Sequence, residues 1–158
     1  MTYEKFGNII LFKKRKGLDD RLISNLTGSD YVHSGIKVHR NVAESLGKWG
    51  KRTNFLPTMF DWIELEHKDI TMKDREQLKK IHQEEPYIYD FIQVALLAFR
   101  RYSLCITDTL NLSVYGNQCS GRDAKMYDRL GLKVLEGIHW SQIVPRDFLH
   151  SPYFRIIK

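Results

Sequence analysis

Apolar and polar positions along the first part of the chain follow the patterns of strands. Residues 7–12 form an apolar run that ends at a block of charges, which is typical of a buried strand. Residues 31–39 and 59–66 alternate well enough between apolar and polar positions to predict two further strands. Leucines spaced four apart predict a short amphipathic helix over residues 18–26. The polar residues 40–57 include two glycines, so we expect a long loop or lid there.

Helical spacing dominates the middle of the chain. Thr71 and Asp74 have the spacing of a capping box, with Asp in place of the usual Glu, and predict a helix that runs to about Gln83. A second helix is expected from Pro86, because proline is well tolerated at the first helical position. Apolar residues cover most sides of this helix as far as Phe99, which is typical of a buried helix.

The last third of the chain predicts one more long helix and a final strand. Ser103 is a suitable cap for the helix, which places Cys105 near its second position and ends it at Gly116. A turn into a short helix is expected at residues 144–147, and a last strand over residues 153–157. Strands, then helices, then a strand predict an α+β fold in which helices pack against an antiparallel sheet.

Composition favours an ordinary globular protein. The chain has 158 residues, 42% apolar and 28% charged, which suits a single domain over residues 1–158 with its own core. No apolar run approaches the roughly 20 residues that a membrane helix needs. No secretory signal pattern is visible at the start, so we expect a cytoplasmic protein or one packaged into a virion. We expect no transmembrane segment.

Positive charge is the main departure from an average composition. The formal net charge is +6, with a dense block at Lys13–Lys16 and a second group at Lys48, Lys51 and Arg52. Such a surplus can attract nucleic acid or other polyanions. Acidic residues, among them Asp20, break up the positive field, and we interpret the block as a solvated turn after a strand. Nucleic acid is therefore not the expected partner.

His33 and Cys105 are the candidate catalytic pair. A thiol at a helix N-terminus has its pKa lowered by the helix dipole and by a nearby imidazolium, and a fixed histidine is its usual activator. The alternative is structural: a small buried cysteine and a hydrogen-bonded strand histidine. Cys119 lies in the turn-rich stretch Asn117–Gly121, where we expect no helix, so it is the weaker candidate nucleophile.

Neither a metal nor a cofactor is expected. The six histidines show no HExxH or comparable ligand spacing. The two cysteines lack a CxxC spacing, so they indicate neither a structural zinc site nor a disulfide framework. Both thiols are expected in a reducing compartment.

The order of these pieces resembles the circularly permuted NlpC-like papain-fold enzymes, a group that includes YiiX-type bacterial proteins and lecithin retinol acyltransferase relatives. The matching segments are residues 7–12, 31–36, 62–65, 87–90, 102–105 and 143–147. The resemblance implies a papain-like fold with the nucleophile at a helix N-terminus. It also implies a histidine that precedes the cysteine in the chain, the reverse of the unpermuted relatives.

The resemblance assigns roles to individual residues. By position, Cys105 is the nucleophile and His33 the base, and Glu64 on the following strand orients the imidazole, with Glu66 and His39 as substitutes. Relatives commonly carry Ser or Thr just before the histidine, and Ser or Thr and then an acid directly after the cysteine. Here Val32 precedes His33, and Ile106 follows Cys105 before Thr107 and Asp108. The phenol side chains of Tyr31 and Tyr102 are candidates for binding substrate, with packing in the core as the alternative role.

The implied function is a thiol hydrolase or acyltransferase that acts on amide or ester bonds without a cofactor. The expected substrate is a peptide, a peptidoglycan-like molecule or a lipid acyl group, with cell-wall peptide amides leading. Such an enzyme would belong to a bacterium or a phage. The alternative is a catalytically inactive structural or binding module on the same fold, for example a virion or assembly component. The altered neighbours Val32 and Ile106 of the two motif residues favour that alternative.

Overall fold

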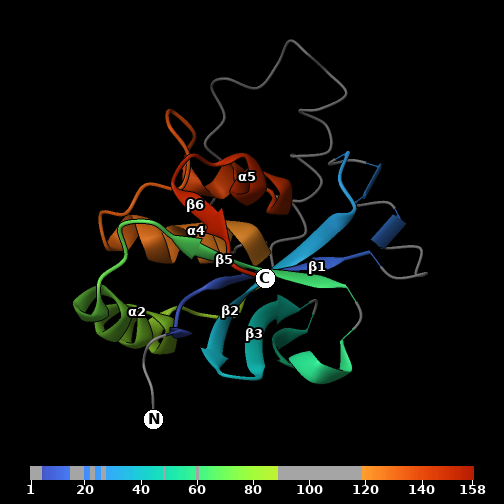
Figure 1. The fold of residues 1–158 in the computed structure, drawn as a ribbon, viewed down its shortest axis with the longest axis horizontal. Helices are drawn as coiled ribbons and strands as arrows, with labels where there is room; N and C mark the ends of the chain where they lie inside the picture. The colour runs from blue at the N-terminus through green and yellow to red at the C-terminus, as the bar shows by residue number, and fades with distance from the viewer. Residues whose placement is uncertain are drawn as a thin grey trace.

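A six-stranded antiparallel sheet organises the molecule (Figure 1). The computed structural model describes residues 5–14, 20–21, 24–25, 28–47, 49–59, 61–88 and 119–158. The strands are β1 (Ile9–Lys13), β2 (Tyr31–His39), β3 (Val42–Gly47), β4 (Gly50–Phe55), β5 (Trp62–His67) and β6 (Phe154–Ile156). Their order in the sheet is β4-β3-β2-β1-β5-β6, and every neighbouring pair is antiparallel. The predicted α+β class and the four predicted strands are confirmed.

The expectation of a loop or lid over residues 40–57 is wrong, because β3 and β4 form a hairpin there. Gly47 pairs with Gly50 at its turn, where Gly50 has a φ of +112° that glycine adopts without strain. The hairpin was hidden because some of its buried positions are polar. Asn54, for example, is buried and donates from Nδ2 to Ser45 Oγ at 3.0 Å.

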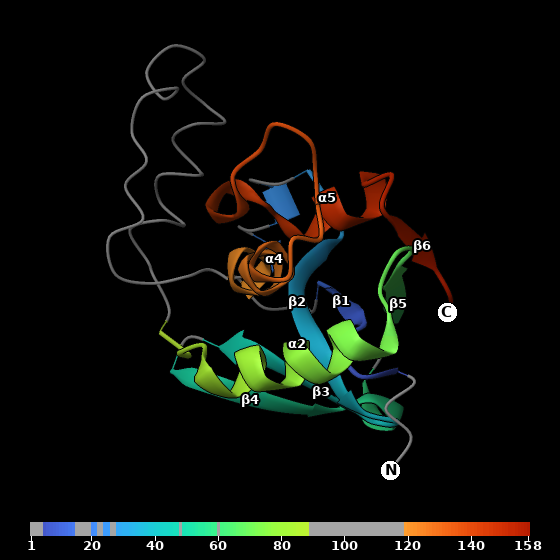
Figure 2. The same ribbon diagram turned by 90° about the vertical axis from the view of Figure 1, so that its left-hand side faces the viewer.

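Three α-helices and two short 3-10 helices are described (Figures 1 and 2). Helix α2 (Met72–Glu84) has the predicted capping box, in which the Thr71 side chain accepts from the Asp74 backbone N–H. Helices α4 (Cys119–Arg129) and α5 (Pro145–His150) follow, with η2 (Leu56–Thr58) and η3 (Trp140–Gln142). The helices expected over residues 86–99 and from Ser103 fall almost entirely on residues 89–118, outside the described residues.

The central strand β1 is buried on both faces, which explains its unbroken apolar sequence. Ile9 and Leu11 belong to the main core cluster, together with Tyr127 of α4 and Phe148 of α5. The alternate residues of β1 pack in a second cluster with Ala43 of β3. Figure 2 shows α4 nearly end-on beside β2, and this contact places the helix start next to the strand that carries His33. None of the described helices has both the length and the apolar character to cross a bilayer.

Candidate functional site

His33 lies on β2 and has two hydrogen-bond partners that differ from the expected ones. The strand is paired on one side with β1, where His33 is opposite Phe12. The Nε2 atom of His33 lies 3.0 Å from Oδ1 of Asp20. The second hydrogen-bond partner of the imidazole is the side chain of Cys119. Nε2 is thus the ring nitrogen that faces the carboxylate.

Cys119 is the first residue of α4 as the structure describes it, and it is buried. The expectation that no helix underlies this cysteine is therefore wrong. Ser120 and Gly121 are poor helix formers, so the start of α4 is weak in the sequence. The apolar spacing of Ala124 and Tyr127, both buried in the main core, was the available signal for the helix. Ser120 directly follows Cys119, as the resemblance leads us to expect, although Gly121 stands where an acid is expected next.

Asp20 is a functional candidate that the sequence did not single out. It was one of several acids interpreted as balancing the positive charge, and nothing in its spacing connects it with a histidine 13 residues later. In the structure its side chain is 14% exposed, compared with 33% for the side chain of His33. The three side chains Cys119, His33 and Asp20 form a connected line, which we call the Cys119–His33–Asp20 chain.

The charge of the imidazole follows from these contacts. Burial by itself lowers the pKa of His33, but the hydrogen bond to Asp20 and the hydrogen bond and charge interaction with Cys119 raise it to about 9. His33 is therefore an imidazolium at neutral pH. The pKa of His33 in the folded state is above its ordinary value of 6.5. Protonated His33 therefore contributes its full stabilisation of the fold below about pH 6.5, and this stabilisation is lost as the pH rises through 9.

This charge state gives a direct spectroscopic prediction. In an NMR titration of histidine side chains, His33 is expected to titrate with a pKa near 9 in the wild-type chain. Asp20→Asn removes the carboxylate partner and Cys119→Ala removes the sulfur partner, and both partners raise the pKa of His33, so each substitution lowers it. His150→Ala at the end of α5 is a control that leaves the His33 titration unchanged. A wild-type pKa near 6.5 that neither substitution moves contradicts the described contacts.

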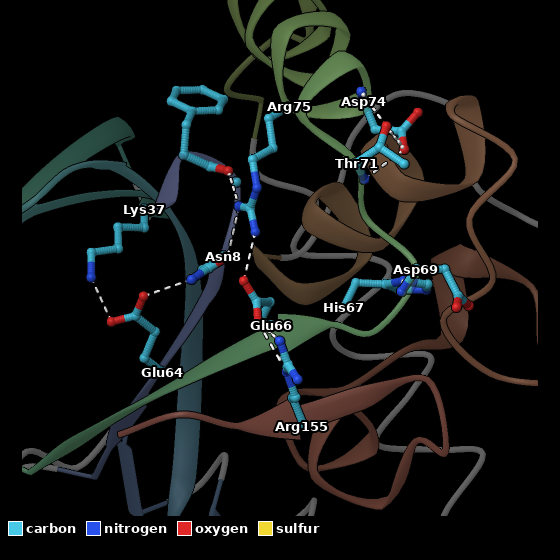
Figure 3. A network of polar contacts seen from close by, with 12 residues as sticks. Asn8, Lys37, Glu64, Glu66, His67, Asp69, Thr71, Asp74, Arg75 and Arg155 are labelled. Atoms are coloured by element: carbon cyan, nitrogen blue, oxygen red, sulfur yellow. Dashed lines mark hydrogen bonds and ion pairs between the residues drawn. The ribbon is translucent and has the colours of Figure 1, made fainter. Parts of the chain in front are cut away.

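Glu64, the expected third catalytic residue, lies in a buried polar network (Figure 3). Its Oε2 accepts from Lys37 Nζ at 2.5 Å and its Oε1 accepts from Asn8 Nδ2 at 2.7 Å. Figure 3 shows the same network continuing from Asn8 to Arg75. Both carboxylate oxygens of Glu64 are thus engaged away from the imidazole, and among the described residues the carboxylate at His33 is that of Asp20.

The remaining expected site residues are placed as follows. Glu66 forms ion pairs with Arg75 and Arg155, and His39 is exposed at the end of β2. Tyr31 packs against the main core cluster. Two other candidates, Cys105 and Tyr102, lie outside the described residues.

Comparisons with known proteins give a fold relationship. No protein-family model and no curated protein sequence matches the chain. Among solved structures, the chain is similar to the crystal structure of the metalloprotein YiiX from Escherichia coli O157:H7. The TM-score is 0.66 at 15% sequence identity, and the match covers 99% of this chain and 98% of that one. The protein therefore has a YiiX-like fold.

Proposed function

We propose that this chain is a cysteine-nucleophile hydrolase or acyltransferase that acts on amide or ester bonds, with Cys119 as nucleophile, His33 as base and Asp20 as the orienting carboxylate. The observation that carries the proposal is the imidazole of His33, which interacts with both the side chain of Cys119 and the carboxylate of Asp20. A nucleophile in contact with a base that a third group orients is the general signature of nucleophilic catalysis.

The first chemical step is acylation of the sulfur. His33 holds the thiol proton as an imidazolium, and the thiolate of Cys119 attacks the carbonyl carbon of the substrate. A C–S bond forms while the C=O π electrons move to oxygen, giving a tetrahedral oxyanion. The oxyanion then collapses and the C–N or C–O bond to the leaving group breaks. His33 donates its proton to the departing amine or alkoxide, leaving a thioester on Cys119.

The start of α4 supplies electrostatic stabilisation for this step. The first backbone N–H groups of a helix have no partner within the helix and carry partial positive charge. We propose the backbone N–H groups of Cys119 and Ser120, in the first described turn of α4, as donors to an oxyanion formed at the sulfur. One such donor is typically worth about 2.7–4 kcal/mol in the activation barrier.

Deacylation uses the same imidazole as a base. Neutral His33 takes a proton from water or from an acceptor alcohol or amine, whose oxygen or nitrogen attacks the thioester carbon. The C–S bond breaks, the sulfur leaves as the thiolate, and the imidazolium is restored. Water gives a carboxylic acid and hence a hydrolase, and another acceptor gives an acyltransferase. Asp20 holds the ring through Nε2 throughout, which leaves Nδ1 to exchange the proton.

The resemblance to the permuted NlpC-like group supports the proposed substrate class. His33 precedes Cys119 in the chain, as the permuted papain-like arrangement requires, and Ser120 follows the cysteine. The proposed substrates are accordingly peptide amides of the cell-wall type or lipid acyl esters. The similar E. coli structure is described as a metalloprotein. Here no group of three or more His, Cys, Asp or Glu among the described residues is arranged to hold a metal ion, so no step is derived through one.

Trapping of the acyl intermediate tests the proposal. The purified chain is mixed with a series of p-nitrophenyl acyl esters and with a cell-wall-type peptide amide, quenched in acid and mapped by mass spectrometry. Both cysteines lie on the tryptic peptide of residues 102–122, so fragmentation of that peptide assigns the acyl group. We expect the group on Cys119, and p-nitrophenol release that falls at least about a hundredfold in Cys119→Ala. Turnover that is equal in the wild type and Cys119→Ala, with no acyl group on the peptide, contradicts it.

A further inference from the structure

Buried polar side chains anchor the first turn of α4 in three directions. Ser120 Oγ donates to the Ile143 carbonyl at 2.7 Å, which ties the turn to the segment between η3 and α5. Arg122 donates from Nη2 to the carbonyls of His82 and Glu85 at the end of α2. Asp123 is the third anchor and is the one that reaches β2. The position of the helix start is therefore set by neighbouring elements as well as by apolar packing.

The bond from Asp123 to β2 is short and fully buried. Ser34 Oγ donates to Asp123 Oδ2 at 2.6 Å, and both residues are 0% exposed. Ser34 directly follows His33 on the strand, and Asp123 follows Cys119 by four residues, which places the two on the same side of the helix. The same two elements are thus joined twice, once by Cys119 and His33 and once, a helical turn away, by Asp123 and Ser34.

Burying the carboxyl group of Asp123 at this place costs folding free energy. Burial raises the pKa of Asp123 to about 7, against the lowering effects of the Arg122 charge and of the Ser34 hydrogen bond. Asp123 Oδ1 has no hydrogen-bond partner in the described structure. Its contact to Arg122 Nη1 is a long 3.8 Å. A well-packed apolar side chain is often at least as stable as a buried charged pair, so stability alone gives no reason for an acid here.

We propose that the Ser34–Asp123 hydrogen bond positions Cys119 against His33, so that Ser34 and Asp123 are positioning residues of the reaction. This inference rests on the proposed function. The bond fixes the height and rotation of α4 relative to β2 at the turn that carries the sulfur. A displacement of about 1 Å between reacting groups can cost a hundredfold in rate, so loss of the bond is expected to reduce the rate while the fold persists.

The test uses Ser34→Ala, with Ser45→Ala as the matched control. Ser45 is also a buried serine whose hydroxyl is hydrogen-bonded, but to Asn54 in the β3–β4 hairpin. For each variant we measure the alkylation rate of Cys119 by iodoacetamide, read by peptide mapping, and the pKa of His33 by NMR. Ser34→Ala is expected to lower the alkylation rate about tenfold or more and to lower the pKa of His33, whereas Ser45→Ala changes neither.

A second variant breaks the same bond from the helix. Asp123→Ala removes the buried acid and is expected to reproduce both effects of Ser34→Ala, whereas Asp123→Asn keeps an acceptor for Ser34 and retains most of the alkylation rate. If either variant that breaks the bond is folded and keeps the wild-type alkylation rate and His33 titration, the positioning role is overturned. If wild-type Cys119 itself reacts no faster than a free thiol, the proposed function fails, a result distinct from failure of the positioning role.

Discussion

Cys119→Ser is expected to abolish fast alkylation of the chain by iodoacetamide at about pH 6.5, with a loss of at least about a hundredfold in rate. The chain has two cysteines, so Cys105→Ser is the matched control, and it is expected to keep the fast phase. The physical reason is the contact with His33, whose positive charge at this pH stabilises the thiolate that reacts.

The same alkylation experiment also tests His33, the proposed base. His33→Ala removes the imidazolium and is expected to slow alkylation of Cys119 about tenfold to a hundredfold at about pH 6.5, with a smaller difference above pH 9, where His33 is neutral in the wild type as well. Fast alkylation that maps to Cys105 and persists in Cys119→Ser contradicts the assignment. Slow alkylation of both thiols in every variant favours the inactive-module alternative.

Glu64→Gln is expected to lower the free energy of unfolding by about 3–5 kcal/mol without moving the titration of His33. Lys37 and Glu64 are each only 4% exposed, so removing one charge leaves the other buried and unpaired. Urea unfolding measures the loss, and NMR measures the pKa of His33 in the folded variant. A catalytic role for Glu64 predicts the opposite pattern, a small change in stability and a large change in the His33 titration.

Two further variants test whether the stability lost in Glu64→Gln comes from leaving a buried charge unpaired. The double variant Lys37→Met with Glu64→Gln removes both charges and keeps an amide oxygen for Asn8, so most of the lost stability is expected to return. Glu136→Gln is the surface control, because its ion pair with Lys133 is exposed and screened by solvent. Equal losses for Glu64→Gln and Glu136→Gln contradict the buried-network account.

The parts of the fold that local pattern determines could be predicted from the sequence. Strand β2 and helix α2 have strong periodicity or a strong cap, and both begin and end within about a residue of the predicted positions. The β3–β4 hairpin could not be predicted, because buried polar residues such as Asn54 are satisfied by partners that only the folded chain supplies. Its exposed edge also carries Lys51 and Arg52, which suppress an apolar pattern.

The same limit applies to the candidate site. The sequence proposes His33 because its strand is clear and a resemblance gives it a role. Asp20 and Cys119 are brought to it by tertiary contacts between segments 13 and 86 residues away, which no local spacing reports. Glu64 was chosen as an acid on the following strand, yet a strand position does not say which charge its side chain meets, and here that charge is Lys37.

The proposed chemistry requires the Cys119 sulfur to lie beside the His33 imidazole, and cross-linking tests this most directly. The folded wild-type chain is treated with 1,3-dibromoacetone, whose first carbon alkylates a reactive thiol and whose third carbon can then alkylate a neighbouring ring nitrogen. We predict a three-carbon bridge that fragmentation of the linked tryptic peptides places between Cys119 and His33, and that is absent in His33→Ala. A product attached to Cys119 alone, or bridged to any other side chain, would contradict the claim.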